Sequence, residues 1–234
     1  MTVTYYGHSA VLVAAESPGA SGPVSLLFDP FITGNPHAEG VVSPDDLSPD
    51  ALLVTHAHFD HYGDTESILE RSGATLICPF EIMVYVQKQM EHTAVQPMNT
   101  GGTADLGWGR VTNTFARHSS SFKDGTYGGL AGGYVVEVGG KTVYHAGDTA
   151  LFGDMARIGE RFDIDLAFLP IGDVLTMGPE DAVEAARMLQ PALTVPLHYG
   201  TFPFLSGQPD DFVRKMASAG MEARAMEPGE RLTL

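Results

Sequence analysis

Residues 51–63 read ALLVTHAHFDHYG, an apolar run followed at once by four potential metal ligands within six positions. These ligands are His56, His58, Asp60 and His61. In an extended segment alternate side chains share a face, so the imidazoles of His56 and His58 can point the same way and grip one ion. Asp60 comes next along that face, and a turn toward a helix would let Asp60 and His61 reach a second ion. The stretch therefore predicts a buried strand that ends in a metal site.

Further ligands must come from other parts of the chain, because a tetrahedral catalytic zinc site takes three protein ligands and keeps one position for water. Three candidates each follow an apolar or β-rich run: His118 in FARHSSS, Asp148 in YHAGDT and His198 in VPLHYG. Strand ends that meet on one rim of a sheet are where α/β folds commonly build their sites. We therefore expect these three residues to join the histidine loop.

The rest of the chain predicts two similar halves, each opening with strands and continuing with alternating strands and helices. We expect a hairpin from residues 3–13 and 24–31 with a turn over 16–23, strands over 51–55, 74–79, 110–116, 164–172 and 192–198, and a second hairpin over 132–148. Helices are expected over 63–73, 80–91, 178–190 and 209–220. The Gly139-Gly140 pair sits where a two-residue turn requires positive φ. The pattern predicts two β-sheets face to face, with helices outside.

Composition narrows the class of protein. The 234 residues are 44% hydrophobic and contain no Ser/Gly-rich linker, which favours one domain over residues 1–234. No apolar run approaches the roughly 18 residues of a membrane span, and no signal-type N-terminus is seen, so we expect a cytoplasmic protein without a membrane partner. The single cysteine, Cys78, excludes a disulfide framework and a thiolate-rich zinc site, and we expect it in a buried strand.

The ordered motifs HAHFDH, HSS, GDT and HYGTFP resemble the metallo-β-lactamase fold superfamily over nearly the whole chain. With GHS near the start and DPF after the second strand, the chain is most similar to the compact metal-dependent hydrolase branch, which includes the ascorbate-6-phosphate lactonase-like and UPF0173-type proteins. The resemblance implies an αββα sandwich of two mixed sheets. It also implies two divalent metal ions, the first held by His56, His58 and His118, the second by Asp60, His61 and His198, with Asp148 bridging them. Because all ligands are nitrogen or oxygen, zinc is favoured, with manganese or iron as alternatives.

The implied ligand set suggests a hydrolytic mechanism. Two divalent ions, offset by the carboxylates of Asp60 and Asp148 and by a shared hydroxide, leave a local charge of about +1, so the pocket would favour anions. The pKa of a metal-bound water falls to about 7, and the resulting hydroxide can attack a carbonyl or a phosphorus atom. We expect Asp60 to act as the catalytic residue that positions the hydroxide and returns a proton to the leaving group.

Four residues near the motifs are candidates for supporting roles. Asp29 and His145 are expected to orient the ligands, since a metal-bound imidazole usually donates its other N–H to a carboxylate or carbonyl. For His8, in GHS, two roles are open: it makes only a structural hydrogen bond at a strand end, or its side chain faces the substrate pocket. Tyr199 follows the ligand His198, and its hydroxyl either contributes to the site or only caps or turns the chain there.

The expected substrate is a small molecule, namely a small anionic ester, lactone or phosphoester. A phosphodiesterase or nuclease on short nucleic acids is the alternative, but 13 basic against 29 acidic residues give a net charge of −16, which disfavours contact with a phosphate backbone. A non-catalytic metal or ligand sensor would be expected to lack a ligand, and none is missing. The absence of a cysteine near any ligand motif argues against antibiotic hydrolysis. The discriminating contacts are expected from residues 31–42, 119–127 and 202–206.

The segment 79–90 also predicts self-association. Met83, Val84 and Val86 cannot all face one core from a single helix, so we expect a homo-oligomer. The alternative is that an adjacent loop covers Tyr85 and its neighbours.

Overall fold

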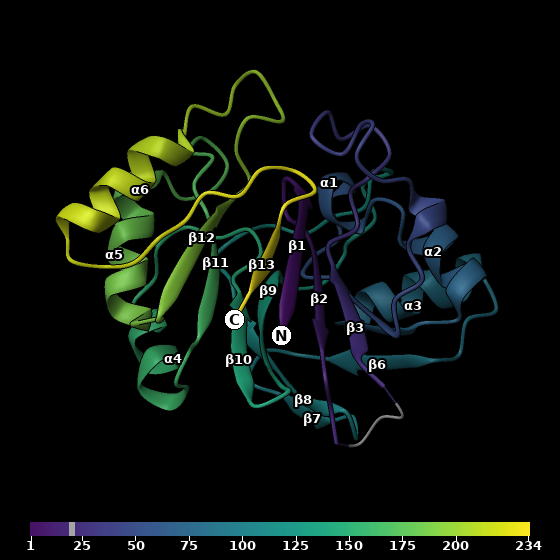
Figure 1. Cartoon of the computed structure of the whole chain (residues 1–234). Coiled ribbons are helices and arrows are strands. Elements are labelled where there is room, and N and C mark those ends of the chain that lie inside the picture. The colour runs from purple at the N-terminus through teal and green to yellow at the C-terminus, as the bar shows by residue number, and fades with distance from the viewer. Residues whose placement is uncertain (19–21) are drawn as a thin grey trace.

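Two β-sheets lie face to face between two layers of helices in the computed structural model, which describes residues 1–18 and 22–234 (Figure 1). The first sheet contains β13 (Arg231–Thr233), β1 (Thr2–Gly7), β2 (Ala10–Ala15), β3 (Val24–Phe28), β4 (Ala51–Leu53), β5 (Thr75–Pro79) and β6 (Val95–Met98), in that spatial order. The second contains β12 (Leu193–Leu197), β11 (Leu166–Pro170), β10 (Lys141–His145), β9 (Gly132–Val138), β8 (Gly109–Phe115) and β7 (Thr103–Asp105). Both sheets mix parallel and antiparallel pairs.

Helices cover the outer face of each sheet (Figure 1). On the side of the first sheet lie α1 (Phe59–Tyr62), α2 (Thr65–Ser72) and α3 (Phe80–Gln89), preceded by a 3-10 turn over Pro44–Asp46. On the side of the second lie α4 (Met155–Arg161), α5 (Pro179–Leu189) and α6 (Pro209–Ser218). The predicted four-layer αββα sandwich is therefore confirmed. No helix in the described part of the chain is long and apolar enough to span a bilayer.

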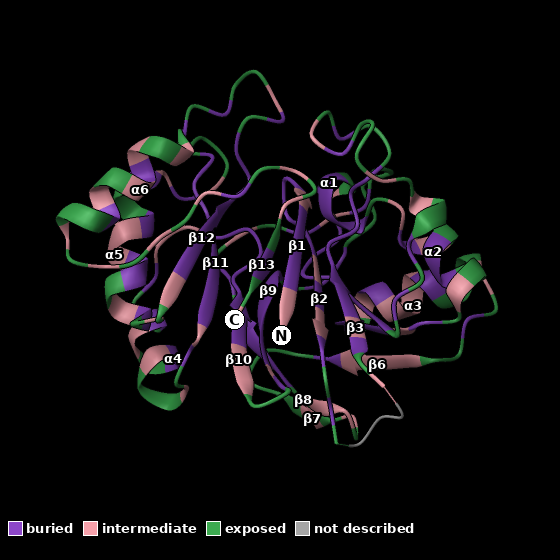
Figure 2. Cartoon of the chain, in the orientation of Figure 1, coloured by how far each residue is buried: buried purple, intermediate pink, exposed green. Residues whose placement is uncertain are grey.

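Continuous apolar runs explain the layers, because a strand buried on both faces needs apolar side chains at every position. In β11 all five residues are buried; Leu166 and Phe168 belong to the core between the sheets, whereas Ala167 and Leu169 pack toward the helices. Figure 2 shows the same pattern across the molecule, with buried strands in the centre and exposed residues on the outer helix faces.

Most predicted elements are found, with bounds that differ by a few residues. The predicted hairpin of 3–13 with 24–31 is the β2–β3 pair, but the segment 3–13 is two strands and not one. It breaks at Gly7 and His8, whose φ angles are +101° and +56°, and β1 and β2 form a further hairpin there. The predicted turn over 16–23 falls partly outside the described residues. The β9–β10 hairpin turns at Gly139 and Gly140, whose φ angles are +59° and +72°, as predicted. Helix α2 ends at Gly73 in the left-handed conformation, also as predicted. The elements β6, β7, α4 and β13 were not predicted from the sequence.

Candidate metal centre

Strand ends bring the predicted ligands to one end of the two sheets. His56 and His58 follow β4 of the first sheet. His118, Asp148 and His198 follow β8, β10 and β12 of the second sheet. The loop after the ALLVT run therefore meets three strand ends from the other sheet, as the sequence predicts.

The short helix α1 orients the second part of the histidine loop. His58 is the residue before this helix, and its carbonyl accepts hydrogen bonds from the N–H groups of His61 and Tyr62 at 3.0 and 2.8 Å. Asp60 and His61 lie on α1, whereas His56 lies in the segment before it. The chain therefore turns into a helix at the position where the sequence requires a turn.

Three imidazoles form the first group. Nε2 of His56 lies 3.0 Å from Nδ1 of His58, and that atom lies 3.2 Å from Nε2 of His118. Metal–nitrogen bonds of 2.0–2.1 Å in a tetrahedron place ligand nitrogens about 3.3 Å apart. The spacing of these nitrogens therefore fits one ion with three histidine ligands.

The second group contains His8 in addition to Asp60, His61 and His198, the ligands implied by the resemblance. One ligand atom from each of these four side chains lies within 4.8 Å of the others. Nε2 of His8 is 3.2 Å from Oδ2 of Asp60, and Nε2 of His198 is 3.8 Å from the same oxygen. A second ion can be held here by nitrogen and oxygen ligands.

Asp148 lies between the two groups. Its Oδ1 is 3.2 Å from Nε2 of His61, and its Oδ2 is 3.0 Å from Nε2 of His198 and 3.6 Å from Nε2 of His118. The carboxylate thus contacts members of both groups, which is the arrangement that a bridging ligand needs.

Unpaired buried atoms test whether the site fits metal ions. Nε2 of His61, Oδ1 of Asp148 and both ring nitrogens of His198 are buried and make no hydrogen bond of regular geometry in the described structure, although Nε2 of His61 and Nε2 of His198 lie 3.2 and 3.0 Å from the Asp148 carboxylate. A buried polar atom without a partner costs about 1–3 kcal/mol, so several in one place need a ligand. Divalent cations, which bind imidazole nitrogen and carboxylate oxygen, would satisfy Nε2 of His61, Nε2 of His198 and Oδ1 of Asp148.

Burial and local charge set the protonation of the ligands. Burial lowers the pKa of His56, His58 and His118 below the usual value, so these rings are neutral, the form that binds metal. Burial acts in the same direction on His61, but the carboxylates of Asp148 and Asp29 outweigh it and raise its pKa well above the usual value. Without metal, a proton on His61 therefore offsets the carboxylate charge.

Asp29 fixes the orientation of two ligand rings. Its Oδ2 accepts a hydrogen bond from Nδ1 of His61 at 2.8 Å, which leaves Nε2 of that ring for a metal. The same carboxylate accepts bonds from the N–H and the hydroxyl of Thr55 at 2.8 and 2.7 Å. Because the Thr55 hydroxyl donates to Asp29, it accepts from Nδ1 of His56, 3.0 Å away, and leaves Nε2 of His56 for a metal.

His8 makes a similar link to Asp60. A carboxylate only accepts, so Nε2 of His8 donates to Asp60, and Nδ1 accepts from the Thr201 hydroxyl at 2.6 Å. Burial and the neighbouring His198 lower the pKa of His8 to about 3. Burial alone would raise the pKa of Asp60, but the hydrogen bond from His8 and the charge of His61 outweigh it and hold that pKa well below the usual range. Asp60 is therefore ionised at neutral pH.

The two remaining candidates make their hydrogen bonds with the backbone. Nε2 of His145 donates to the carbonyl of Ser9 at 3.1 Å, and its Nδ1 accepts from the N–H of Gly147 at 3.2 Å. His145 therefore supports the turn that precedes Asp148. The Tyr199 hydroxyl donates to the carbonyl of Met226 at 3.3 Å, and Tyr199 does not line the cavity over the metal ligands.

A cavity of about 380 Å³ opens over the ligands. His58, Asp60, His118 and Asp148 lie along it. Its other lining residues are Phe59, Ser119, Leu175, Phe202 and Phe204. The metal groups are thus accessible to a small molecule.

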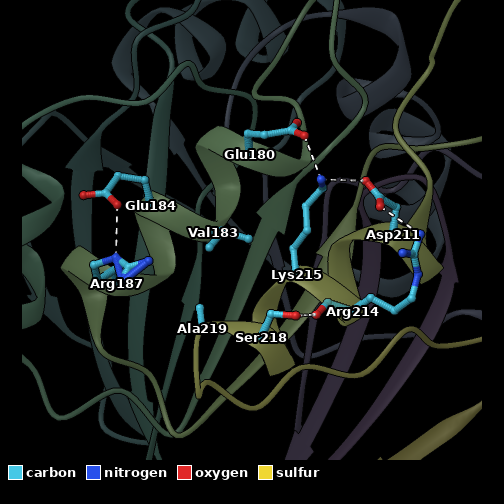
Figure 3. A pocket seen from close by; sticks show the side chains of 9 residues that line it. All are labelled: Glu180, Val183, Glu184, Arg187, Asp211, Arg214, Lys215, Ser218 and Ala219. Carbon is cyan, nitrogen blue, oxygen red and sulfur yellow. Dashed lines mark hydrogen bonds and ion pairs between the residues drawn. The ribbon is translucent and has the colours of Figure 1, made fainter.

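A larger hollow of about 490 Å³ lies between α5 and α6 and contains no histidine. Its charges satisfy one another, as Figure 3 shows: Nζ of Lys215 lies 2.9 Å from Glu180 and 3.4 Å from Asp211, and Arg187 pairs with Glu184 at 3.1 Å. A groove with paired, exposed charges offers no group poised for chemistry.

Sequence reasoning missed Thr55, and it left open the roles of His8 and of Thr201, whose hydroxyl follows the ligand His198 closely in the chain. Thr55 is the single hydroxyl at the end of an apolar run, which is a usable signal. Thr201 lies 193 positions from His8, and nothing local in the sequence links the two.

Comparisons with known proteins find a matching family model and full-length relatives. A family model described as a beta-lactamase superfamily domain matches residues 25–199. A UPF0173 metal-dependent hydrolase of Salinibacter ruber is 46% identical over 234 residues, covering all of both chains. A relative of the same description from Thermus thermophilus is 47% identical over 232 residues, covering 99% of this chain and 98% of the relative.

Solved structures resemble the fold as well. Igni18, a metallo hydrolase from the archaeon Ignicoccus hospitalis, superposes with a TM-score of 0.87 at 39% identity, covering 100% of this chain and 97% of that one.

Proposed function

This chain belongs to the beta-lactamase superfamily and is a metal-dependent hydrolase, and on that premise we propose that it uses two metal ions to hydrolyse a small ester, lactone or phosphoester. The first ion is assigned to His56, His58 and His118, and the second to Asp60, His61 and His198, with Asp148 shared. Zinc is the preferred metal for these nitrogen and oxygen ligands, with manganese or iron as alternatives.

One observation carries the proposal: the buried, unpaired atoms of His61, Asp148 and His198 lie beside a cavity that Asp148 itself lines. Within the protein, Nε2 of His61 and Nε2 of His198 have the Asp148 carboxylate as an ion-pair partner but make no regular hydrogen bond, which leaves them available to a metal ion. Their convergence at a solvent-accessible cavity supports a catalytic centre in which ions and substrate meet.

Divalent ions at this position would lower the pKa of bound water to about 7 and polarise the bond to be cleaved. Asp60 lines the cavity and is ionised, so it acts as a proton acceptor that orients the attacking water. His8 holds the Asp60 carboxylate through its 3.2 Å hydrogen bond. The proton taken up by Asp60 is then delivered to the leaving group.

The lining of the cavity supports a small substrate over a nucleic acid. None of its lining residues is Lys or Arg, whereas a nucleic-acid enzyme neutralises several phosphates with such side chains. The metal ions would be the positive charges beside the substrate in this cavity. They can balance one anionic group at the reacting bond, as in a small molecule, but not a row of phosphates.

Metal analysis with an activity panel tests the proposal. The chain is stripped with a chelator, reloaded with zinc, manganese or iron, and assayed on lactones, carboxylic esters, phosphoesters and short oligonucleotides. We expect two ions per chain and faster turnover of the small substrates than of the oligonucleotides.

His58→Ala and His92→Gln form a matched pair for this test, because His92 lies outside the ligand groups. His58→Ala should reduce the metal content and the turnover, and His92→Gln should preserve both. One ion per chain after full reloading would contradict the dinuclear assignment.

A further inference from the structure

The cavity over the metal ligands has a distinctly apolar wall. Phe59, Leu175 and Phe204 line it and are 52, 52 and 50% exposed. Phe202 lines it between them and is partly buried. Large apolar side chains gathered at the mouth of a site are costly to expose and commonly mark a binding surface.

The aromatic rings of this wall form one continuous surface. Phe202 contacts Phe31, Phe59 and Phe204 with ring centroids 6.3, 6.0 and 5.5 Å apart, and the rings of Phe202 and Phe204 are nearly parallel at 6°. Phe31, at the base of the cluster, is only 4% exposed. The exposed rings are therefore anchored to the core; Phe202 and Phe204 lie parallel, and Phe59 is inclined to Phe202 by 64°.

Two loops that carry the wall are tied together. The Ser206 hydroxyl donates to Oδ2 of Asp173 at 2.9 Å, and the Ser206 N–H donates to the carbonyl of Gly172 at 3.1 Å. Asp173 and Val174 have φ angles of +62° and +49°, and a β-branched residue such as Val174 rarely adopts such a conformation. These contacts tie the loop before Leu175 to the loop that bears Phe202 and Phe204, and all three residues line the cavity.

Charge in the cavity disfavours an anionic group on the non-reacting part of the substrate. The charged residues in the lining are the carboxylates Asp60 and Asp148, and no Lys or Arg lines it. The ions would bind the reacting group, while any further carboxylate or phosphate would face apolar side chains and pay for its desolvation.

We infer that the non-reacting part of the substrate is an uncharged aryl group that packs on Phe202, Phe204 and Leu175. This inference rests on the proposed function, and it refines the substrate class to an aryl-bearing ester or lactone. The parallel ring pair and the apolar side chain of Leu175 suit an aromatic ring, which gains from offset stacking as well as from burial. The reacting bond then lies over Asp60 and His118 at the metal end of the cavity.

Three esters with the same leaving group test the inference: methyl phenylacetate, methyl hydrogen succinate and methyl acetate. With the metal-loaded protein we expect kcat/KM for methyl phenylacetate to exceed that for the anionic succinate ester at least tenfold. Phe204→Ala should lower kcat/KM for methyl phenylacetate about tenfold and change that for methyl acetate less than twofold. Phe80→Ala, which removes a ring that is equally exposed but lies outside the cavity, should change neither.

Calorimetric binding of phenylacetate to the same proteins separates this inference from the proposed function. If no ester is turned over but phenylacetate binds and Phe204→Ala weakens its binding about tenfold, the aryl site stands and the proposed hydrolysis fails. If esters are turned over but the succinate ester is preferred, or Phe204→Ala affects all three esters equally, the aryl site is overturned and the hydrolase stands. A change of oligomeric state in Phe204→Ala, measured by sedimentation, would also overturn it, because the wall would then be a subunit interface.

Discussion

The carboxylate of Asp29 lies 2.8 Å from Nδ1 of His61 and also accepts the hydroxyl of Thr55, which in turn lies 3.0 Å from His56. One buried side chain thus orients rings from both metal groups, although it belongs to neither.

Replacing Asp29 with Asn should weaken metal binding about 10- to 100-fold, because the carboxylate accepts hydrogen bonds at both oxygens and the NH2 group of an amide would face one of these donors. Chelator competition measures the affinity, and circular dichroism verifies the fold. Asp50→Asn is the control, since Asp50 also accepts backbone and hydroxyl hydrogen bonds, from Ser25, but touches no histidine. Equal losses in the two variants would contradict the orienting role of Asp29.

Replacing Asp148 with Ala should leave a folded chain whose kcat is reduced at least about 100-fold. The side chain contacts His61, His118 and His198, and its removal takes away the group shared between the two metal groups. Single-turnover kinetics and metal content should be measured together. Wild-type turnover in this variant would show that Asp148 is not shared between the ions.

Replacing Gly147 with Ala should destabilise the protein by roughly 2–4 kcal/mol, from unfavourable φ and overpacking together. Gly147 has a φ of +61°, and an added Cβ would lie 2.7 Å from the carbonyl of Gly132 and 2.9 Å from Cβ of Thr55. Gly140→Ala is a matched control, because Gly140 has a φ of +72° but no atom within 4 Å of such a Cβ. Urea unfolding measures both, and similar losses would contradict the close packing around Gly147.

The Cys78 thiol should react with a thiol reagent at pH 8 at least about 1000-fold more slowly in the folded chain than in urea. Burial raises its pKa well above the usual value, so little thiolate is present. Because the folded pKa is higher than the unfolded value of about 8.5, the stability contributed by the neutral thiol is present below that pH and is lost as pH rises above it. If Cys78 in the folded chain were labelled as fast as a solvent-exposed cysteine, it would lie outside the core.

Self-association through α3 stays a prediction, to be measured by sedimentation at micromolar concentration. The alternative is that a loop covers Tyr85. The Tyr85 ring stacks on Phe122 with centroids 3.6 Å apart, so a loop of the same chain does cover this residue. Phe80 remains 50% exposed on the helix. If an oligomer forms through α3, Phe80→Asp should dissociate it, whereas a monomeric wild-type profile would contradict the prediction.

Much of the metal centre could be predicted because its residues occur in short local patterns. The HAHFDH stretch sets four ligands on one loop, and His118, Asp148 and His198 each follow a strand of apolar residues. The position of His8 beside Asp60 could not be predicted from the sequence. It depends on the packing of residues 52 positions apart and on a φ of +56° at His8.

The elements missed in the sequence are those whose local pattern is weak. Strand β6 contains Pro97, and β7 and β13 have only three residues each. Helix α4 contains Gly159, which reads as a helix breaker. In the structure this glycine allows close packing, because an added Cβ would lie 2.5 Å from the carbonyl of Met188 on α5.

Because the metal ligands come from both sheets, metal binding also affects how the protein unfolds. His56 and His58 come from the first sheet and His118 from the second, and Asp148 and His198 of the second sheet meet Asp60 and His61 beside the first. Each bound ion would therefore act as a cross-link between the halves, and its binding energy would enter the cooperativity of unfolding. Metal loss would therefore weaken the link between the two sheets, which their shared apolar core still joins, and would leave the strand pairing within each sheet intact.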